Sequence, residues 1–336
     1  MYFLGIETSC DETAAAVFTD EPRVLANVIA SQTELHSRFG GVVPEVAARA
    51  HLRQLIPVVD EALRKAGVRL DQIGGIAVHH TPGLVGALLI GVSAAKMLAV
   101  TLDVPLLGVN HVHAHVYACR VAAGRDIFPV VGLVVSGGHT ALFNCPTALD
   151  YELLGTTRDD AAGEAFDKVA AILGLGFPGG PAVDREAVAG DPRAFKFPRS
   201  MLEPDSLDFS FSGLKTAVLY TVQGQDRSKP VQPPTGQRRA DVAASFQQAV
   251  VDVLTKKASL ALRRAGSTRL AVGGGVSANR ALRVALKEMC DAEGYELFTS
   301  PSELCTDNAA MAALAVEKWK RGEIASLDLD AEPSLR

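Results

Sequence analysis

Apolar and polar residues alternate along this chain in blocks that predict strands and helices in turn. At the start, YFLGIETSCDETAAAVFT has two apolar runs separated by the polar stretch TSCDET, which predicts two strands joined by a tight turn. Residues 130–145, VVGLVVSGGHTALFNC, repeat this arrangement around a glycine turn. Two such repeats indicate two related lobes that present backbone N–H groups to one ligand in a cleft.

Segments with helical spacing separate the strands. Residues 44–67 begin with a proline, carry apolar residues at helical spacing and end in a glycine, which predicts a helix. Residues 73–100 and 269–289 each predict a strand, a glycine-rich loop and a helix, and residues 241–266 predict a long amphipathic helix. Strands that alternate with helices predict an α/β fold with parallel or mixed sheets.

The length of the chain favours two lobes. With 336 residues, 48% of them hydrophobic, it can bury two moderate cores. We expect an N-terminal lobe at residues 1–109 and a C-terminal lobe at residues 110–307 with the metal and nucleotide site. The fold class suggests that a last helix, at about 308–325, packs back on the first lobe. Residues 223–239 contain three prolines and few apolar residues, which predicts a flexible insertion.

Cysteine usage and the apolar segments bear on the compartment. The five cysteines are widely scattered and show no CxxC pair, which is typical of a reduced, cytoplasmic protein. The first twelve residues carry three acids and no basic residue, unlike a signal peptide. Residues 84–102 are nearly all apolar, but Lys96 interrupts them and their glycines suit close packing. We predict a buried helix there and no membrane span.

Net charge limits how the chain can meet nucleic acid. The formal charge is -5 and the pI is about 5.9, so RNA is not gripped over the whole surface and any contact must be local. Each basic cluster taken alone is explained more simply as a solvated helix face or loop. The clusters are Arg193/Lys196/Arg199, Arg238/Arg239, Lys256/Lys257 and Arg263/Arg264.

The segment NHVHAHVYA carries the strongest chemical signal. His111 and His115 stand four residues apart, so one helical face can direct both imidazoles at one metal ion, whereas His113 would point elsewhere. Asp307, just before an apolar segment, is a candidate third ligand, and such a set leaves coordination positions open for catalysis. The alternative is that these histidines only satisfy a buried helix end. A zinc peptidase is disfavoured because Val112 stands where its glutamate is needed.

Other polar positions indicate nucleotide binding. Three glycine-rich turns, at residues 136–139, 177–181 and 273–279, allow backbone N–H groups to approach phosphate. Asp167 and Asp184 are suited to hold ribose hydroxyls, although surface ion pairs or helix caps would look similar. Asp11 and Glu12 lie in the first turn, where an acid can orient a metal-bound water or accept a proton. Ordinary turn residues would look the same.

Long motifs along nearly the whole chain resemble one family, the tRNA N6-adenosine threonylcarbamoyltransferases, whose bacterial members are called TsaD. The matching motifs are GIETSCDET, GGVVPEVAARAH, GVNHVHAH, LVVSGGHTAL, DDAAGEAFDKVA, FPGGPAVDREA, FSFSGLKTAV, GGGVSANRALR and LCTDNAAMAA. One departure is visible: Thr81 stands where relatives commonly have glycine. If that glycine had a positive φ, the loop must bend differently here.

The resemblance implies a fold, a metal and a set of substrate contacts. The fold would be the actin-like, sugar-kinase and Hsp70 type, with a nucleotide cleft between two lobes. One divalent metal ion, iron(II) in preference to zinc, would be held by His111, His115 and Asp307. The residues expected to contact the adenylate are Val134, Val135, Ser136, Gly137, Gly138, Asp167, Gly180, Asp184 and Asn279.

The resemblance also implies a reaction and partners. The threonylcarbamoyl group of threonylcarbamoyl-AMP would move to N6 of adenosine 37, next to the anticodon, in tRNAs that read codons beginning with A. AMP would leave, and TsaB-like and TsaE-like proteins would assist. Our own hypothesis, from their position in the first turn, is that Asp11 or Glu12 accepts the proton. Two alternatives remain: a small-metabolite kinase of the same fold, which has no need of two imidazoles, and a non-catalytic, nucleotide-regulated scaffold.

Overall fold

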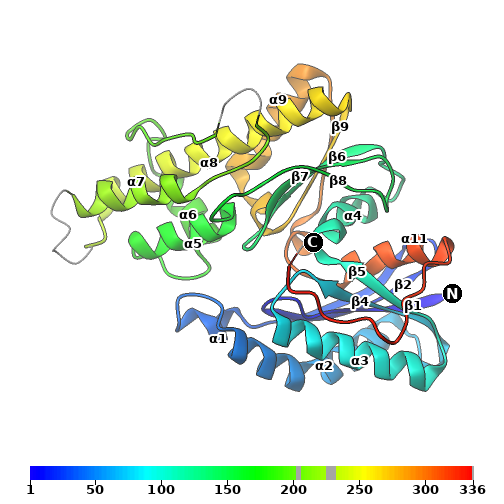
Figure 1. Ribbon diagram of the computed structural model, residues 1–336. Helices are drawn as coiled ribbons and strands as arrows, with labels where there is room; N and C mark the ends of the chain where they lie inside the picture. The colour runs from blue at the N-terminus through cyan, green and yellow to red at the C-terminus, as the bar shows by residue number, and fades with distance from the viewer. Residues whose placement is uncertain (202–205, 225–231, 335–336) are drawn as a thin grey trace. The chain divides into compact units, whose positions relative to one another are not determined.

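The computed structural model describes residues 1–201, 206–224 and 232–334, and its helices and strands confirm the predicted α/β class (Figure 1). Contacts divide the chain into two compact units. Unit 1 contains Met1–Ile127, Ala148–Asp150 and Ser300–Arg336, and unit 2 contains Phe128–Thr147 and Tyr151–Thr299. The lobe boundary after residue 109 stays a prediction. Residues 225–231 of the insertion predicted at 223–239 lie outside the described residues.

Unit 1 is built on one mixed sheet, whose strands are β1 (Tyr2–Glu7), β2 (Glu12–Thr19), β3 (Val24–Ser31), β4 (Ile73–Thr81) and β5 (Leu106–Asn110). The strand order is β3-β2-β1-β4-β5, with an antiparallel β1–β2–β3 meander and parallel β4 and β5. The predicted first hairpin is therefore confirmed. The remaining elements are α1 (Thr33–Ser37), α2 (Pro44–Ala66), η1 (Leu70–Gln72), α3 (Val85–Leu102), α4 (His111–Ala123), α10 (Ser302–Cys305), η3 (Ala309–Leu314) and α11 (Ala315–Lys320).

Unit 2 repeats this topology. Its strands are β6 (Val130–Val135), β7 (Thr140–Cys145), β8 (Glu152–Thr156), β9 (Arg269–Gly273) and β10 (Glu296–Thr299). Their order is β10-β9-β6-β7-β8, again an antiparallel meander from β6 with two parallel strands on its other side. The repeat predicted from the sequence is thus present in the strand connections. The helices are α5 (Ala162–Ile172), α6 (Gly179–Ala187), α7 (Ser212–Gln223), α8 (Gly236–Ala265), η2 (Gly275–Ala278) and α9 (Arg280–Glu293).

Helix α2 follows the sequence signals closely. Pro44 lies in its first turn, where a missing N–H costs no hydrogen bond, and Gly67 ends it with a φ of 67°. Its buried face includes Leu55, Val58 and Ala62, which pack into the apolar core beside the strands of unit 1. Burial of this face, more than helix propensity, stabilises the element.

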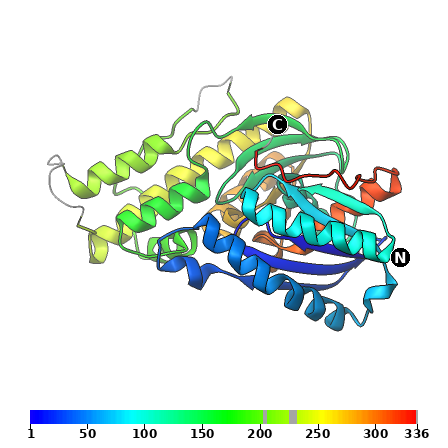
Figure 2. The same ribbon diagram turned by 60° about the horizontal axis from the view of Figure 1, so that its bottom comes forward.

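Helices α2 and α3 lie side by side over one face of the unit 1 sheet (Figure 2). In the part of the chain that the structure describes, α3 is the one helix long and apolar enough to cross a membrane, and a third of it is buried. Its buried side includes Leu88, Val92 and Ala95, whereas Met97 and Val100 are exposed. The predicted burial therefore holds for one face of the helix.

Candidate metal centre and nucleotide site

The two histidines predicted to bind a metal, His111 and His115, lie on the first turns of α4, directly after β5. Asn110 ends the strand, and its Oδ1 accepts hydrogen bonds from the N–H groups of Val112 at 2.9 Å and His113 at 3.1 Å. This cap satisfies two of the free amides at the helix start and fixes where the helix begins. His111 is therefore the first helical residue, and His115 follows one turn later on the same face.

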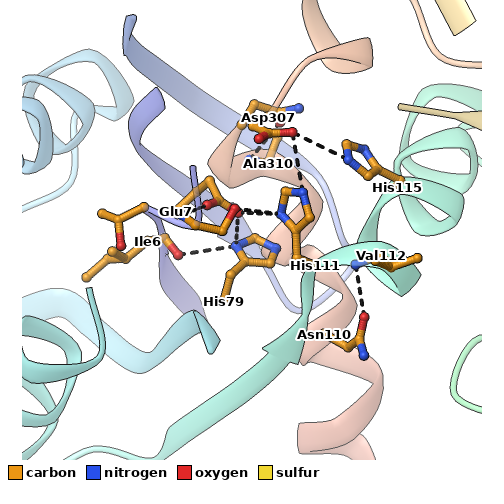
Figure 3. Close-up of polar contacts among 12 residues, drawn as sticks. Ile6, Glu7, His79, Asn110, His111, Val112, His115, Asp307 and Ala310 are labelled. Carbon is orange, nitrogen blue, oxygen red and sulfur yellow. Dashed lines mark hydrogen bonds and ion pairs between the residues drawn. The ribbon is translucent and has the colours of Figure 1, made fainter. Parts of the chain in front are cut away.

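Asp307 completes the predicted set. The Nε2 atoms of His111 and His115 each lie 3.4 Å from its Oδ1, and both imidazoles point toward that carboxylate (Figure 3). Ligand atoms of the three residues lie within 4.8 Å of one another. Asp307 is held in place by the short α10 before it and by Asn308, whose side chain caps η3 after it. The structure thus brings together three residues that are far apart in sequence.

The donor atoms of this group fit a metal ion. Among the described residues, the buried Nε2 of His115 has no hydrogen-bond partner, although Asp307 lies at ion-pair distance. A buried ring nitrogen without a partner costs free energy, and a cation would remove that cost. Two imidazoles and one carboxylate form an open ligand set of the catalytic type. The group can therefore hold a metal ion, while the choice of metal is not set by these atoms.

Attraction between the carboxylates and the imidazoles stabilises His111, His115 and Asp307 in the absence of a metal. Burial alone would raise the pKa of Asp307, but the His111 and His115 imidazoles hold it well below its usual range. Burial opposes protonation of His111, yet Asp307 and Glu7 raise its pKa well above the ordinary value. Burial lowers the pKa of His115, which favours the neutral form that binds metals.

Glu7 and His79 are parts of this site that sequence reasoning missed. Both are fully buried, and Oε2 of Glu7 lies 2.9 Å from Nδ1 of His79 and 2.9 Å from Nδ1 of His111. Burial raises the pKa of the Glu7 carboxyl, but the two imidazoles outweigh this effect and hold the pKa well below its usual range. A glutamate at the inner end of an apolar strand was the available signal, because an unpaired charge is not stable there.

Asp11 ends the turn between β1 and β2 and Glu12 begins β2; both are the predicted proton acceptors. His51 on α2 lies 3.0 Å from the Cys10 carbonyl through its Nε2, and the N–H of Gln32 donates to the Asp11 carbonyl at 3.0 Å. These contacts fix the turn from two sides. Burial, together with the charges of Asp11 and Asp307, raises the pKa of Glu12 to about 10.

In unit 2, two of the three predicted glycine turns, residues 136–139 and 273–279, meet at the end of β6. Residues 136–139 form the β6–β7 turn, and a Cβ on Gly137 or Gly138 would meet no other atom within 4 Å. By contrast, a Cβ on Gly163 would lie 2.5 Å from the Ser136 carbonyl, and Gly274 has a φ of 91° directly against Val135. Gly163 and Gly274 are thus required for close packing, whereas Gly137 and Gly138 leave the turn open to a ligand.

Asp184 and Asn279, both predicted to contact substrate, lie together in unit 2. Nδ2 of Asn279 donates to Asp184 Oδ1 at 3.3 Å, and Nε of Arg280 donates to Asp184 Oδ2 at 2.8 Å. Arg280 is therefore a polar neighbour that sequence reasoning did not single out. Asp167 serves a local role as well, since its Oδ1 accepts from the N–H of Gly179 at 2.7 Å. Gly180, in the first turn of α6, has open space beside it.

Two further sequence observations have structural outcomes. The described non-glycine residues with positive φ are Asp103 and Met201, so Thr81 needs no glycine-like backbone; the close approach in this loop falls at Gly83. Several of the basic residues considered for RNA are already engaged within the unit. Arg199 pairs with Asp252, Arg239 with Glu186 and Arg263 with Glu293, and the buried Lys257 donates to the Ser206 carbonyl.

Fold and site together define a class: an α/β protein of two repeated units with a candidate catalytic metal centre. Comparison with known proteins narrows this to a family. Residues 23–314 match the family profile "TsaD: tRNA N6-adenosine threonylcarbamoyltransferase". Two relatives of that name, from Rhodopirellula baltica and an Anaeromyxobacter species, are 51% and 52% identical; the first alignment covers 99% of this chain and 96% of the relative, the second all of both. The chain belongs to the tRNA N6-adenosine threonylcarbamoyltransferase family.

Solved structures support the fold. The chain resembles full-length HypF, in its phosphate- and nucleotide-bound form, with a TM-score of 0.62 and 16% sequence identity over 96% of this chain and 46% of that one. At this identity the likeness shows the fold alone, and it confirms the actin-like class expected from the motifs. The curated relatives are named as transferases, which favours a transferase over a kinase or a scaffold.

Proposed function

We propose that this protein transfers the threonylcarbamoyl group of threonylcarbamoyl-AMP to N6 of adenosine 37 in tRNAs that read codons beginning with A. One observation carries the proposal: a buried His115 Nε2 without a hydrogen bond faces Asp307 beside His111, in a chain about half identical to transferases of this name. A kinase that uses Mg²⁺ would have no need of this imidazole pair.

His111, His115 and Asp307 would hold one divalent cation, for which we propose iron(II) in preference to zinc. When bound, the cation supplies Lewis-acid polarisation of a carbamoyl or phosphate oxygen. The protein's part is rigidity: Asn110 fixes the start of α4, so that both imidazoles project from adjacent turns of one helix. A ligand set held in this way needs little reorganisation during the reaction.

Unit 2 would hold the adenylate. In our proposal, the N–H groups of Gly137 and Gly138 donate hydrogen bonds to the phosphate oxygens, because those of Ser136 and His139 already donate within the turn. Successive N–H groups of a glycine turn form an anion-binding concavity. Asp184 would accept hydrogen bonds from ribose hydroxyls, and Asn279 would keep its carboxylate oriented. The full proposed set is Val134, Val135, Ser136, Gly137, Gly138, Asp167, Gly180, Asp184 and Asn279.

The proposed chemistry balances as an acyl transfer. N6 of adenosine forms a bond to the carbamoyl carbon, the bond from that carbon to the phosphate oxygen breaks, and AMP leaves. N6 loses one proton, for which we assign Asp11 as acceptor. Glu12, whose pKa is raised by burial and the neighbouring carboxylates, would act beside it as a hydrogen-bond donor.

We also propose that TsaB-like and TsaE-like partners assist and that the reaction takes place in the cytoplasm. The net charge of -5 supports a need for help with tRNA, because the chain lacks an overall positive surface charge. Full-rate modification of tRNA by the purified chain alone would contradict the partner proposal.

Depletion and restoration in cells tests the function. Nucleoside mass spectrometry of total tRNA should show loss of N6-threonylcarbamoyladenosine on depletion, with recovery from the intact chain and none from Asp307→Ala. His113→Ala is the matched control, because His113 lies on the same helix and outside the ligand group. Unchanged modification on depletion would overturn the proposed function.

A further inference from the structure

Glu7 lies at the centre of a buried hydrogen-bond cluster behind the metal-ligating histidines. It is the last residue of β1, and its side chain is completely buried. One carboxylate oxygen, Oε1, accepts from the N–H of Ser9. The other, Oε2, lies between the imidazoles of His79 from β4 and His111 from α4, 2.9 Å from Nδ1 of each (Figure 3). Three segments of unit 1 therefore meet at one carboxylate.

These contacts fix which nitrogen of His111 keeps its proton when the ring is neutral and binds a metal. An ionised carboxylate has only acceptors, so Nδ1 of His111 must donate, and the lone pair of the neutral ring is then on Nε2. Nε2 is the atom that faces Asp307 at 3.4 Å. Nδ1 of His79 must donate as well, because both of its neighbours are acceptors: Oε2 of Glu7 at 2.9 Å and the Ile6 carbonyl at 3.3 Å.

We propose that Glu7, braced by His79 and the Ser9 amide, is the positioning residue that fixes His111 as a metal ligand. Metal-bound histidines generally donate their second ring nitrogen to such an acceptor, which sets the ring's orientation and strengthens it as a ligand. The inference rests on the metal centre proposed above. The competing explanation is that the cluster only ties β1, β4 and α4 together, and the two explanations differ in what happens to metal affinity.

Glu7→Gln separates them, because an amide cannot reproduce this set of contacts. If its oxygen faces the imidazoles, its NH₂ group meets the Ser9 N–H, and two donors oppose each other. If its NH₂ group faces the imidazoles, Nδ1 of His111 must become an acceptor and the proton moves to Nε2. The first orientation loosens the side chain that orients His111, because the Ser9 N–H then opposes it, and the second blocks Nε2 with a proton. We expect a loss of Zn²⁺ affinity of roughly 10- to 100-fold, measured by chelator competition with zinc as the only metal.

Glu317→Gln is the matched control. Glu317 also binds α4 through its carboxylate, since Tyr117 Oη donates to it at 2.7 Å, but it does not contact the metal-ligating residues. This variant should lose some stability and keep the wild-type Zn²⁺ affinity. An equal loss of affinity in both variants would assign Glu7 to general tethering of the fold.

A second background tests whether Glu7 acts through His111. In His111→Ala, which keeps His115 and Asp307, adding Glu7→Gln should change the remaining Zn²⁺ affinity by less than about threefold, because the ligand that Glu7 orients is gone. If Glu7→Gln lowered Zn²⁺ affinity by the same factor in the wild type and in His111→Ala, the proposal would be overturned. Failure of the wild-type chain to bind Zn²⁺ would instead remove the metal centre itself.

A spectroscopic measurement keeps the proposal testable even if the Glu7 variant does not fold. In the zinc-loaded wild-type protein labelled with ¹⁵N-histidine, His111 should show a protonated Nδ1 and a metal-bound Nε2. Binding through Nδ1, or an unprotonated Nδ1, would contradict the role of Glu7, because its carboxylate would then have no donor from His111.

Discussion

The two units have the same strand connections but opposite chemistry at the first hairpin turn. In unit 1 the β1–β2 turn, residues 8–11, is closed by buried side chains; Thr8 donates to the Ala87 carbonyl at 2.8 Å. In unit 2 the β6–β7 turn, residues 136–139, exposes Gly137 and Gly138, with open space beside both. One topology therefore provides an acid and imidazole cluster in one copy and an open backbone turn in the other.

The difference teaches that the side chains carried by a shared topology, and not the topology itself, set the ligand chemistry. In unit 1 the imidazoles of β4 and α4 and the carboxylates of Glu7 and Asp307 meet beside the first hairpin, which suits a cation. Glycines in unit 2 leave backbone amides accessible, which suits an anion such as phosphate. Exchanging one kind of ligand for the other should therefore not be possible by small changes in either turn.

The largest effect is expected from removing a ligand in unit 1. His115→Ala should lose bound metal almost completely, with at least roughly a 100-fold loss of affinity, since one of three protein donors is gone. His113→Ala, two residues away, should keep its metal. Metal content per chain, measured by mass spectrometry on matched preparations, checks this. Equal metal content in the two variants would remove the cation site from unit 1.

Glycine substitutions in unit 2 should divide into two groups. Gly163→Ala places a Cβ 2.5 Å from the Ser136 carbonyl and should destabilise the protein by about 1–3 kcal/mol. Gly137→Ala meets no atom within 4 Å, so its free energy of unfolding should stay within about 0.5 kcal/mol of wild type.

Nucleotide binding sharpens the same comparison. Gly137→Ala should weaken AMP binding by roughly tenfold in calorimetry, because the added Cβ occupies the open space beside the turn and holds the phosphate away from its amides. Loss of one well-aligned phosphate contact costs about 1.4 kcal/mol. Metal affinity should not change. If AMP bound equally well to the variant, the open turn of unit 2 would not be the phosphate site.

The smallest effect concerns acid stability of unit 2. Lys168 and Lys215 each donate a hydrogen bond to Asp160 at 2.8 Å. Burial raises the pKa of the Asp160 carboxyl, but these two partners outweigh it and lower the pKa from its ordinary value of 3.8. The contribution of these ion pairs to the free energy of unfolding is therefore complete above about pH 4, and it is lost as the pH falls through the lowered pKa. Asp160→Asn should cost roughly 1–2 kcal/mol at pH 7, and that cost should shrink below pH 4. A cost that stays constant down to pH 2 in denaturant titrations would contradict this.

Much of this could be predicted because the signals are local. Pro44 and Gly67 mark α2, and the four-residue spacing of His111 and His115 gives a shared helical face wherever the helix packs. Asp307 needed the family resemblance in support, because nothing local in its segment distinguishes a ligand from a helix-capping residue.

Glu7 and His79 could not be assigned in the same way. Glu7 adjoins a polar turn, where an acid normally faces water. Its burial depends on β4 and α4 bringing His79 and His111 to it from 72 and 104 residues away in the chain. Likewise, the pairing of Asp184 with Arg280 joins residues 96 apart. Contacts of this kind depend on tertiary packing and leave no spacing pattern in the sequence.

Transfer activity measured against metal content tests the central claim most directly. Purified wild-type chain and His111→Ala, supplied with partner proteins, tRNA and labelled threonylcarbamoyl-AMP, would be assayed for label on adenosine 37 after graded removal of metal by a chelator. The account predicts that transfer falls in proportion to bound metal in the wild type and is lost in His111→Ala, while the fold persists by circular dichroism. Full transfer by metal-free wild-type protein, or by His111→Ala, would contradict it.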